Sequence, residues 1–131
     1  DRFVAHLLAR YRETLTRQPL GLENIEAMLH SLHYGSQYYG CFMINTLTQR
    51  ATVPEGAFAK ALEASEEIEA LYAGNLANAL GRGQIARGSN VSGLGKMLQT
   101  LDQGLHIQGL AGATDAQKDR VILAVMAGLR V

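Results

Sequence analysis

The chain has 131 residues, of which 47% are hydrophobic and 18% charged, so it can form one domain with its own core but is too short for two. Twelve Lys and Arg residues balance twelve Asp and Glu residues, and this zero net charge excludes an overall basic field for a phosphate backbone. The single cysteine, Cys41, excludes an internal disulfide and a four-thiolate zinc site. No apolar run is long enough to span a bilayer, and we expect a cytoplasmic protein with no membrane partner.

Apolar residues at steps of three and four predict three helices in the first half of the chain. The first covers about residues 1–17 and the second about residues 22–34. The third, from about Tyr38 to Leu47, is apolar nearly all round, so we expect it to lie buried. No stretch alternates apolar and polar residues over five or more positions, and no strand is predicted.

Three further helices are predicted in the second half. Residues 52–55, Thr-Val-Pro-Glu, have the spacing of a capping box that opens a long helix reaching about residue 82. Ser89 or Asn90 can cap a fifth helix. Residues 114–117, Thr-Asp-Ala-Gln, form a second capping box that opens the sixth. Six helices with short links predict an all-α fold in which residues 1–131 form a single domain. One apolar face on the fifth helix is predicted from Leu94, Leu98, Leu101 and Leu105.

The last two predicted helices carry wider apolar faces than so small a domain is expected to cover. Large exposed apolar patches usually mark interfaces. A two-fold homodimer, in which each subunit gives both helices to a four-helix bundle, would cover them. A compact monomer whose core absorbs both faces is the alternative. We expect the dimer interface to contain Met97, Gly104, Leu105, Val121, Ile122, Val125 and Leu129.

Several polar or amphipathic side chains lie within or beside apolar helical faces, namely His33, Tyr38, Asn45, Tyr72, Asn75 and His106. Such mixtures line small-molecule pockets, where a few polar atoms orient a mainly apolar ligand. Each of these residues can instead be a satisfied core group or lie at the surface. The residues that we predict to line a ligand pocket are Met28, His33, Phe42, Asn45, Tyr72, Met97, Leu101 and His106.

Glu26, His30 and His33 lie at positions i, i+4 and i+7, so they can share one helical face. One carboxylate with two imidazoles is acceptable ligand chemistry for Zn²⁺ or Fe²⁺. Spacing assigns no further ligand, and a polar helix surface is the simpler interpretation. We therefore predict no metal, no cofactor and no catalytic residue, and keep a small helical metalloenzyme as an alternative. Cys41 lies in an apolar run and is expected to be a buried, inert thiol.

Four segments of the chain carry a resemblance to a known family. Residues 40–45, Gly-Cys-Phe-Met-Ile-Asn, open the third predicted helix, and Gly83-Gln84-Ile85 ends the long helix that follows. Residues 101–114 form the penultimate helix and its turn, and residues 1–12 form the first helix. Taken in chain order, the four segments resemble the regulatory core of the TetR/AcrR transcriptional regulators, over essentially the whole chain. The positions that match the motifs are Gly40, Cys41, Asn45, Gly104 and Gln108.

The resemblance implies an effector-binding, dimerising C-terminal domain and no enzymatic activity. In that family a small molecule binds among the helices, and its preference for one conformation changes the spacing of two N-terminal helix-turn-helix units. No helix-turn-helix is expected within these 131 residues, so operator DNA would be bound only through that separate N-terminal domain. Gly40 and Cys41 would then be packing positions, and the effector is expected to be small and apolar or aromatic. A ligand-free helical dimerisation module is a further alternative.

Overall fold

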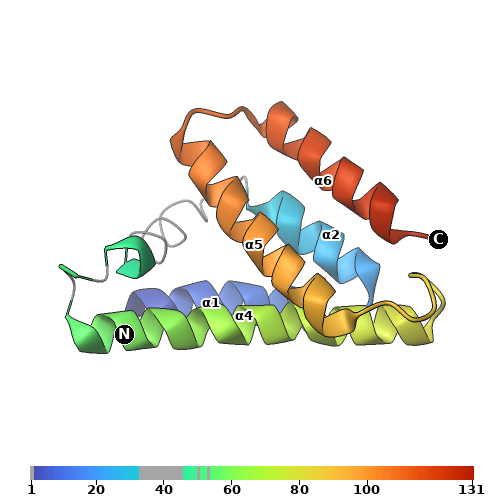
Figure 1. The fold of residues 1–131 in the computed structure, drawn as a ribbon, viewed down its shortest axis with the longest axis horizontal. Coiled ribbons are helices and arrows are strands. Elements are labelled where there is room, and N and C mark those ends of the chain that lie inside the picture. Colours follow the sequence, from blue (N-terminus) through green and yellow to red (C-terminus); the bar gives the residue numbers. More distant parts are fainter. Residues whose placement is uncertain (1, 33–45, 50, 53) are drawn as a thin grey trace.

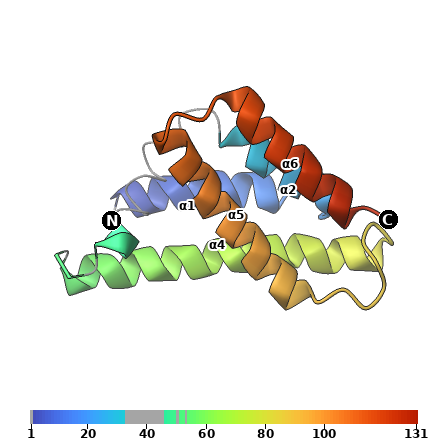
Figure 2. The same cartoon turned by 45° about the horizontal axis from the view of Figure 1, so that its top comes forward.

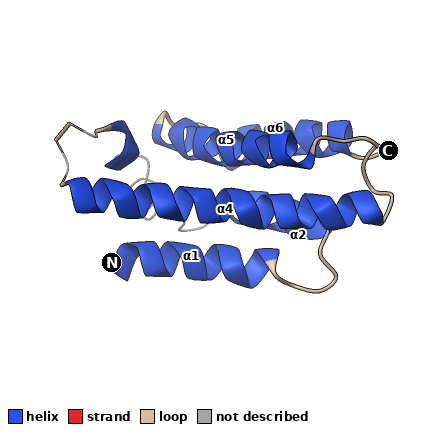
Figure 3. Cartoon of the chain, turned by 60° about the horizontal axis from the view of Figure 1, so that its bottom comes forward, coloured by secondary structure: helices blue, strands red, loops and turns tan. Residues whose placement is uncertain are grey.

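The fold is all-α throughout the part of the chain that the computed structural model describes, residues 2–32, 46–49, 51–52 and 54–131. Within these ranges there is no strand, which confirms the predicted fold class (Figure 3). Most of the third predicted helix, including Cys41, lies outside the described residues, although residues 46–48 are helical. The helices with defined bounds are α1 (Arg2–Leu15), α2 (Leu22–Ser31), α4 (Glu55–Gly81), α5 (Val91–Leu110) and α6 (Asp115–Leu129) (Figure 1).

The long helix α4 is the element on which α1, α2 and α5 pack. Helix α1 runs beside α4 in the same direction. Two contacts that advance together along both helices show this: Arg12 pairs with Glu67, and the carbonyl of Leu15 accepts a hydrogen bond from Asn75. Helix α5 crosses α4 obliquely, whereas α6 lies against α2 (Figure 2). The last two helices therefore pack on different partners within one chain. None of the described helices is both long and apolar enough to cross a membrane.

The core is built from the apolar faces that the helical spacing predicts. Each large apolar side chain moved from water into such a core contributes about 1.5–3 kcal/mol. The large side chains that are at most 1% exposed come from all five helices and are Tyr11, Leu15, Ile25, Met28, Leu29, Ile68, Tyr72, Leu76, Leu98, Ile122 and Met126.

Helix α5 lies close to α4 at Gly95. A Cβ atom placed there would lie 3.1 Å from the Cβ atom of Ala73 and 3.6 Å from the carbonyl oxygen of Glu69. An added Cβ atom would therefore force Ala73 to shift by a few tenths of an ångström, and the sequence reasoning did not identify this approach. Among the described residues, a Cβ atom at Gly104 would meet no atom within 4 Å, so Gly104 does not mediate close packing inside the chain.

The helix starts agree with the sequence prediction at two places and differ at one. The Thr114 hydroxyl accepts from the Gln117 amide at 3.2 Å while the Gln117 side chain accepts from the Thr114 amide at 2.8 Å, so the capping box of α6 is confirmed. Asn90 caps α5 by accepting from the amide of Gly93 at 3.0 Å. The capping box predicted at residues 52–55 is wrong. Pro54, in an extended conformation, is the N-cap of α4, and Thr52 instead donates to the carbonyl of Gln49.

Candidate functional site

A carboxylate, Asp102, lies in the centre of the core on α5 and is completely buried. The Tyr11 hydroxyl of α1 donates to its two oxygens at 2.8 and 2.9 Å. The Tyr72 hydroxyl of α4 donates to Oδ2 at 2.6 Å. The two tyrosine rings meet edge to face with centroids 6.4 Å apart. Three helices are thus joined at one buried charged group.

Both hydroxyls are held in their protonated, donating form. Burial raises the pKa of Tyr11 and of Tyr72 well above the ordinary value, and the negative charge of Asp102 raises it further. A buried carboxylate is tolerated when hydrogen bonds replace its lost hydration. Two protonated tyrosines supply those bonds here.

His106 lies one helical turn beyond Asp102 and is 2% exposed. Its Nε2 atom is 3.4 Å from Oδ1 of Asp102, which is within ion-pair range but outside hydrogen-bond geometry. Within the described part of the chain, neither ring nitrogen has a hydrogen-bond partner. An unsatisfied buried polar atom costs about 1–3 kcal/mol, so the imidazole can gain free energy by bonding to a ligand. We call Tyr11, Tyr72, Asp102 and His106 the Asp102 cluster.

A second buried polar group, Asn75 of α4, is fully satisfied. Its Oδ1 atom accepts from the amide of Gly21 at 3.1 Å and from Asn24 at 2.9 Å. Its Nδ2 atom donates to the carbonyls of Leu15 at 2.8 Å and Leu71 at 2.9 Å. These bonds fix the connection between α1 and α2 against α4, which is a structural role and leaves no atom of Asn75 for a ligand.

The predicted pocket residues are only partly brought together. Tyr72 and His106 both contact Asp102. Met28 is buried on α2, Leu101 is half-buried, and Met97 is 39% exposed. The remaining three predicted residues, His33, Phe42 and Asn45, lie outside the described residues.

Sequence reasoning missed two members of the Asp102 cluster. Tyr11 was assigned to an apolar face without a role for its hydroxyl. Asp102 was not named as a candidate; it follows Leu101, a member of the expected leucine face. Of that face, Leu98 and Leu105 are buried and Leu94 and Leu101 only half-buried. The spacing of Asp102 and His106, four residues apart, places both on one face of the helix, but it does not show that this face is buried.

The metal-site residues are engaged in contacts between α2 and α6. Glu26 forms an ion pair with Arg130. The Nδ1 atom of His30 lies 2.9 Å from Oδ1 of Asp119, and its Nε2 atom lies 3.8 Å from Glu26. His33 lies outside the described residues. Among the residues that are described, no group of three or more His, Cys, Asp or Glu side chains is arranged to hold a metal.

The predicted interface residues fall into two groups. Leu105, Ile122 and Leu129 are buried in the core of this chain. Met97 and Val121 are 39% and 42% exposed, and Gly104 and Val125 are half-buried. Three more large apolar side chains on α5 and α6 are exposed, namely Ile107, Leu110 and Leu123.

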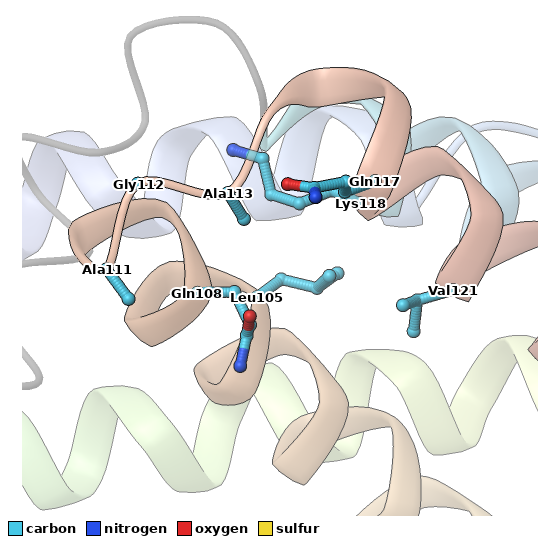
Figure 4. A pocket seen from close by; sticks show the side chains of 8 residues that line it. All are labelled: Leu105, Gln108, Ala111, Gly112, Ala113, Gln117, Lys118 and Val121. Carbon is cyan, nitrogen blue, oxygen red and sulfur yellow. The ribbon is translucent and has the colours of Figure 1, made fainter.

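A cavity of about 480 Å³ lies between α5 and α6 at the turn that joins them (Figure 4). Leu105 and Gln108 line it from α5, and Gln117, Lys118 and Val121 line it from α6, with residues 111–113 of the turn between them. Lys118 is only 4% exposed. Its Nζ atom lies 3.6 Å from Oδ1 of Asp115.

Comparison of the chain with protein-family models, with curated proteins and with solved structures finds no match in any of the three. The function therefore has to be argued from the residues and their arrangement.

Proposed function

We propose that this chain is the regulatory half of a transcriptional regulator of the TetR/AcrR type. In this proposal a small apolar or aromatic effector binds among the helices and changes the DNA affinity of an N-terminal helix-turn-helix domain. The observation that carries the proposal is the Asp102 cluster, which connects α1 to α4 and α5 through a buried carboxylate. By the resemblance, α1 is the helix that leads to the DNA-reading domain.

The cluster offers a physical route from effector to α1. His106 has two buried ring nitrogens with no hydrogen-bond partner among the described residues, and it adjoins the carboxylate that holds Tyr11. An effector that bonds to His106 or takes the place of the Tyr11 hydroxyl would alter the hydrogen bonds between Tyr11 of α1 and Asp102 of α5. The effector shifts the conformational equilibrium only as far as it binds one arrangement more tightly than the other.

Dimerisation is proposed from the apolar surface of α5 and α6. Four exposed side chains support it, with exposed fractions of 39–58%: Met97, Ile107, Leu110 and Val121. Large exposed apolar patches usually mark interfaces. Gly104 adds a position on α5 where another chain could approach closely.

The dimer is tested by light scattering on the wild type and on Val121→Glu. The wild type should have the mass of a dimer, and the variant should be monomeric because a desolvated charge at an interface is costly. Lys60→Glu is the matched control, since Lys60 is exposed on α4, and this variant should keep the dimer mass. A monomeric wild type would refute this part of the proposal.

Effector binding is tested by screening small apolar and aromatic compounds for a rise in melting temperature. A compound at 100 times its Kd stabilises the folded protein by about 2.7 kcal/mol. The shift should be lost in His106→Leu and retained in His6→Leu, a substitution at an exposed position on α1. If no compound raises the melting temperature of a stable dimer, the chain is better described as a ligand-free dimerisation module.

The DNA-reading part is tested by determining the reading frame upstream of Asp1. A basic three-helix segment that runs into residues 1–12 is expected. An unrelated domain there would contradict the regulator proposal. The metalloenzyme alternative is favoured by no contact in the described residues, because Glu26 and His30 are already paired with Arg130 and Asp119.

A further inference from the structure

The cavity between α5 and α6 is separate from the Asp102 cluster in its lining residues, and it has the size of a small-molecule site. Its volume of about 480 Å³ lies within the range of roughly 300–1,000 Å³ that is usual for such sites. Leu105 and Val121 give it apolar walls, and Gln108 and Gln117 add amide groups. The cavity lies between α5, which packs on α4, and α6, which packs on α2.

One cation, the ammonium group of Lys118, lines this cavity, and its positive charge is only partly neutralised by a carboxylate. The Lys118 side chain is 5% exposed, and its nearest carboxylate in the described chain, that of Asp115, lies 3.6 Å away, beyond a normal hydrogen bond. The Asp115 side chain is 59% exposed, so solvent screens its attraction for Lys118. A buried cation of this kind gains from an anion that approaches to hydrogen-bond distance. The first turn of α6 adds the partial positive charge of a helix N-terminus.

We infer that this cavity binds an amphipathic carboxylate, with its carboxylate on Nζ of Lys118 and its apolar chain between Leu105 and Val121. The single buried cation selects one negative charge, and the apolar walls select a hydrocarbon or aromatic body. This inference goes beyond the proposed function, since it requires neither the DNA-reading domain nor the Asp102 cluster.

The test measures the binding of three probes with the same ten-carbon chain by calorimetry. The probes are decanoate, decanol and decyltrimethylammonium, each kept below the concentration at which it aggregates. Decanoate should bind at one site per chain and at least about tenfold more tightly than the other two, because only decanoate forms a charge-assisted hydrogen bond with Lys118. Equal affinities for all three probes would overturn the inference.

Substitutions then locate the site. Lys118→Met keeps most of the apolar stem and removes the charge, and it should weaken decanoate binding by about tenfold or more while leaving decanol unchanged. Lys96→Met is the matched control, because Lys96 is 69% exposed on α5 and pairs with Glu69 away from the cavity. It should bind decanoate as the wild type does. Undiminished decanoate affinity in Lys118→Met would refute the assignment.

A second variant keeps the test decisive if Lys118→Met does not fold. Val121→Phe narrows the cavity from a half-exposed position and should weaken decanoate binding without removing the cation. Unchanged binding in this variant would place the ligand elsewhere. Leu105 and Val121 also belong to the predicted dimer surface, so mass is measured in the same solutions. If the protein is a monomer that binds decanoate, only the proposed dimer is refuted. If it is a dimer that does not bind decanoate, only the present inference is refuted.

Discussion

Tyr11 and Asp102 are 91 residues apart in the sequence, yet the Tyr11 hydroxyl donates to both oxygens of the Asp102 carboxylate at 2.8 and 2.9 Å. This contact joins the first described helix to the second-last one through the interior of the protein. Tyr72 adds a hydrogen bond from α4 to the same carboxylate. The stability of the domain should therefore depend on groups that are more often found at surfaces.

Replacing Tyr11 by Phe should lower the free energy of unfolding by about 1.5–3 kcal/mol, as is usual for a hydrogen bond to a charged group. Tyr72→Phe should have a similar effect. The double variant should deviate from the sum of the two, because both hydroxyls serve one carboxylate. Urea denaturation of the three variants measures these changes in the free energy of unfolding. Losses below about 0.5 kcal/mol in both single variants would show that the carboxylate is solvated in another way.

Alkaline pH should unfold the protein through the same two tyrosines. Their pKa values are raised in the folded state above the ordinary value of 10.0, so the unfolded chain releases these protons first. Their contribution to stability is complete below about pH 10 and is lost as the pH rises toward the folded pKa values. Each tyrosine contributes a slope of about 1.4 kcal/mol per pH unit in this window.

Denaturation at a series of pH values above 9 checks this dependence. The wild type should lose stability more steeply with pH than the variant that carries Tyr11→Phe and Tyr72→Phe. The other ionisable groups are common to both proteins, so the difference in slope isolates the two tyrosines. Identical slopes would contradict the raised pKa values.

Asn75→Ala should destabilise the protein by about 3 kcal/mol or more. The substitution leaves the amide of Gly21 and the carbonyl of Leu15 buried without their partner, and each unsatisfied group costs about 1–3 kcal/mol. Asn78→Ala is the control, one turn later on the same helix, where the exposed side chain donates only to the carbonyl of Gly74. Its effect should stay within about 0.5 kcal/mol. Chemical denaturation distinguishes the two, and equal effects would show that the Asn75 bonds add nothing.

Two threonines that both begin a capping-box pattern in the sequence should differ in their contribution to the stability of the protein. Thr114→Ala removes the cap of α6 and should cost about 1 kcal/mol. Thr52→Ala should change stability by less than about 0.5 kcal/mol, because Thr52 does not cap α4 and bonds only to the carbonyl of Gln49. Thermal melts of both variants test the pair. A larger loss at Thr52 would mean that the first turn of α4 is capped from that residue.

The sequence alone determined the fold class and most helix bounds. Helical periodicity is local, and residues three and four apart share a face in any helix, so α1, α2, α4, α5 and α6 could be placed before their partners were known. The caps at Asn90 and Thr114 are equally local, since donor and acceptor lie within one turn. At the start of α4 the capping pattern was misleading, because the helix begins at Glu55 and its N-cap is Pro54 instead of Thr52.

Only the tertiary structure decided which polar groups share the interior. Tyr72 and His106 could be proposed as site residues because both interrupt apolar faces, but their meeting point, Asp102, could not. A buried carboxylate and an exposed one have the same sequence pattern, and the difference is whether α1 and α4 bring two hydroxyls to it. The packing of α6 on α2, which opens the cavity at Lys118, likewise depends on contacts between residues far apart in the chain. Local spacing defines the face of a helix, whereas the choice of partner depends on the free energy of the whole packed arrangement.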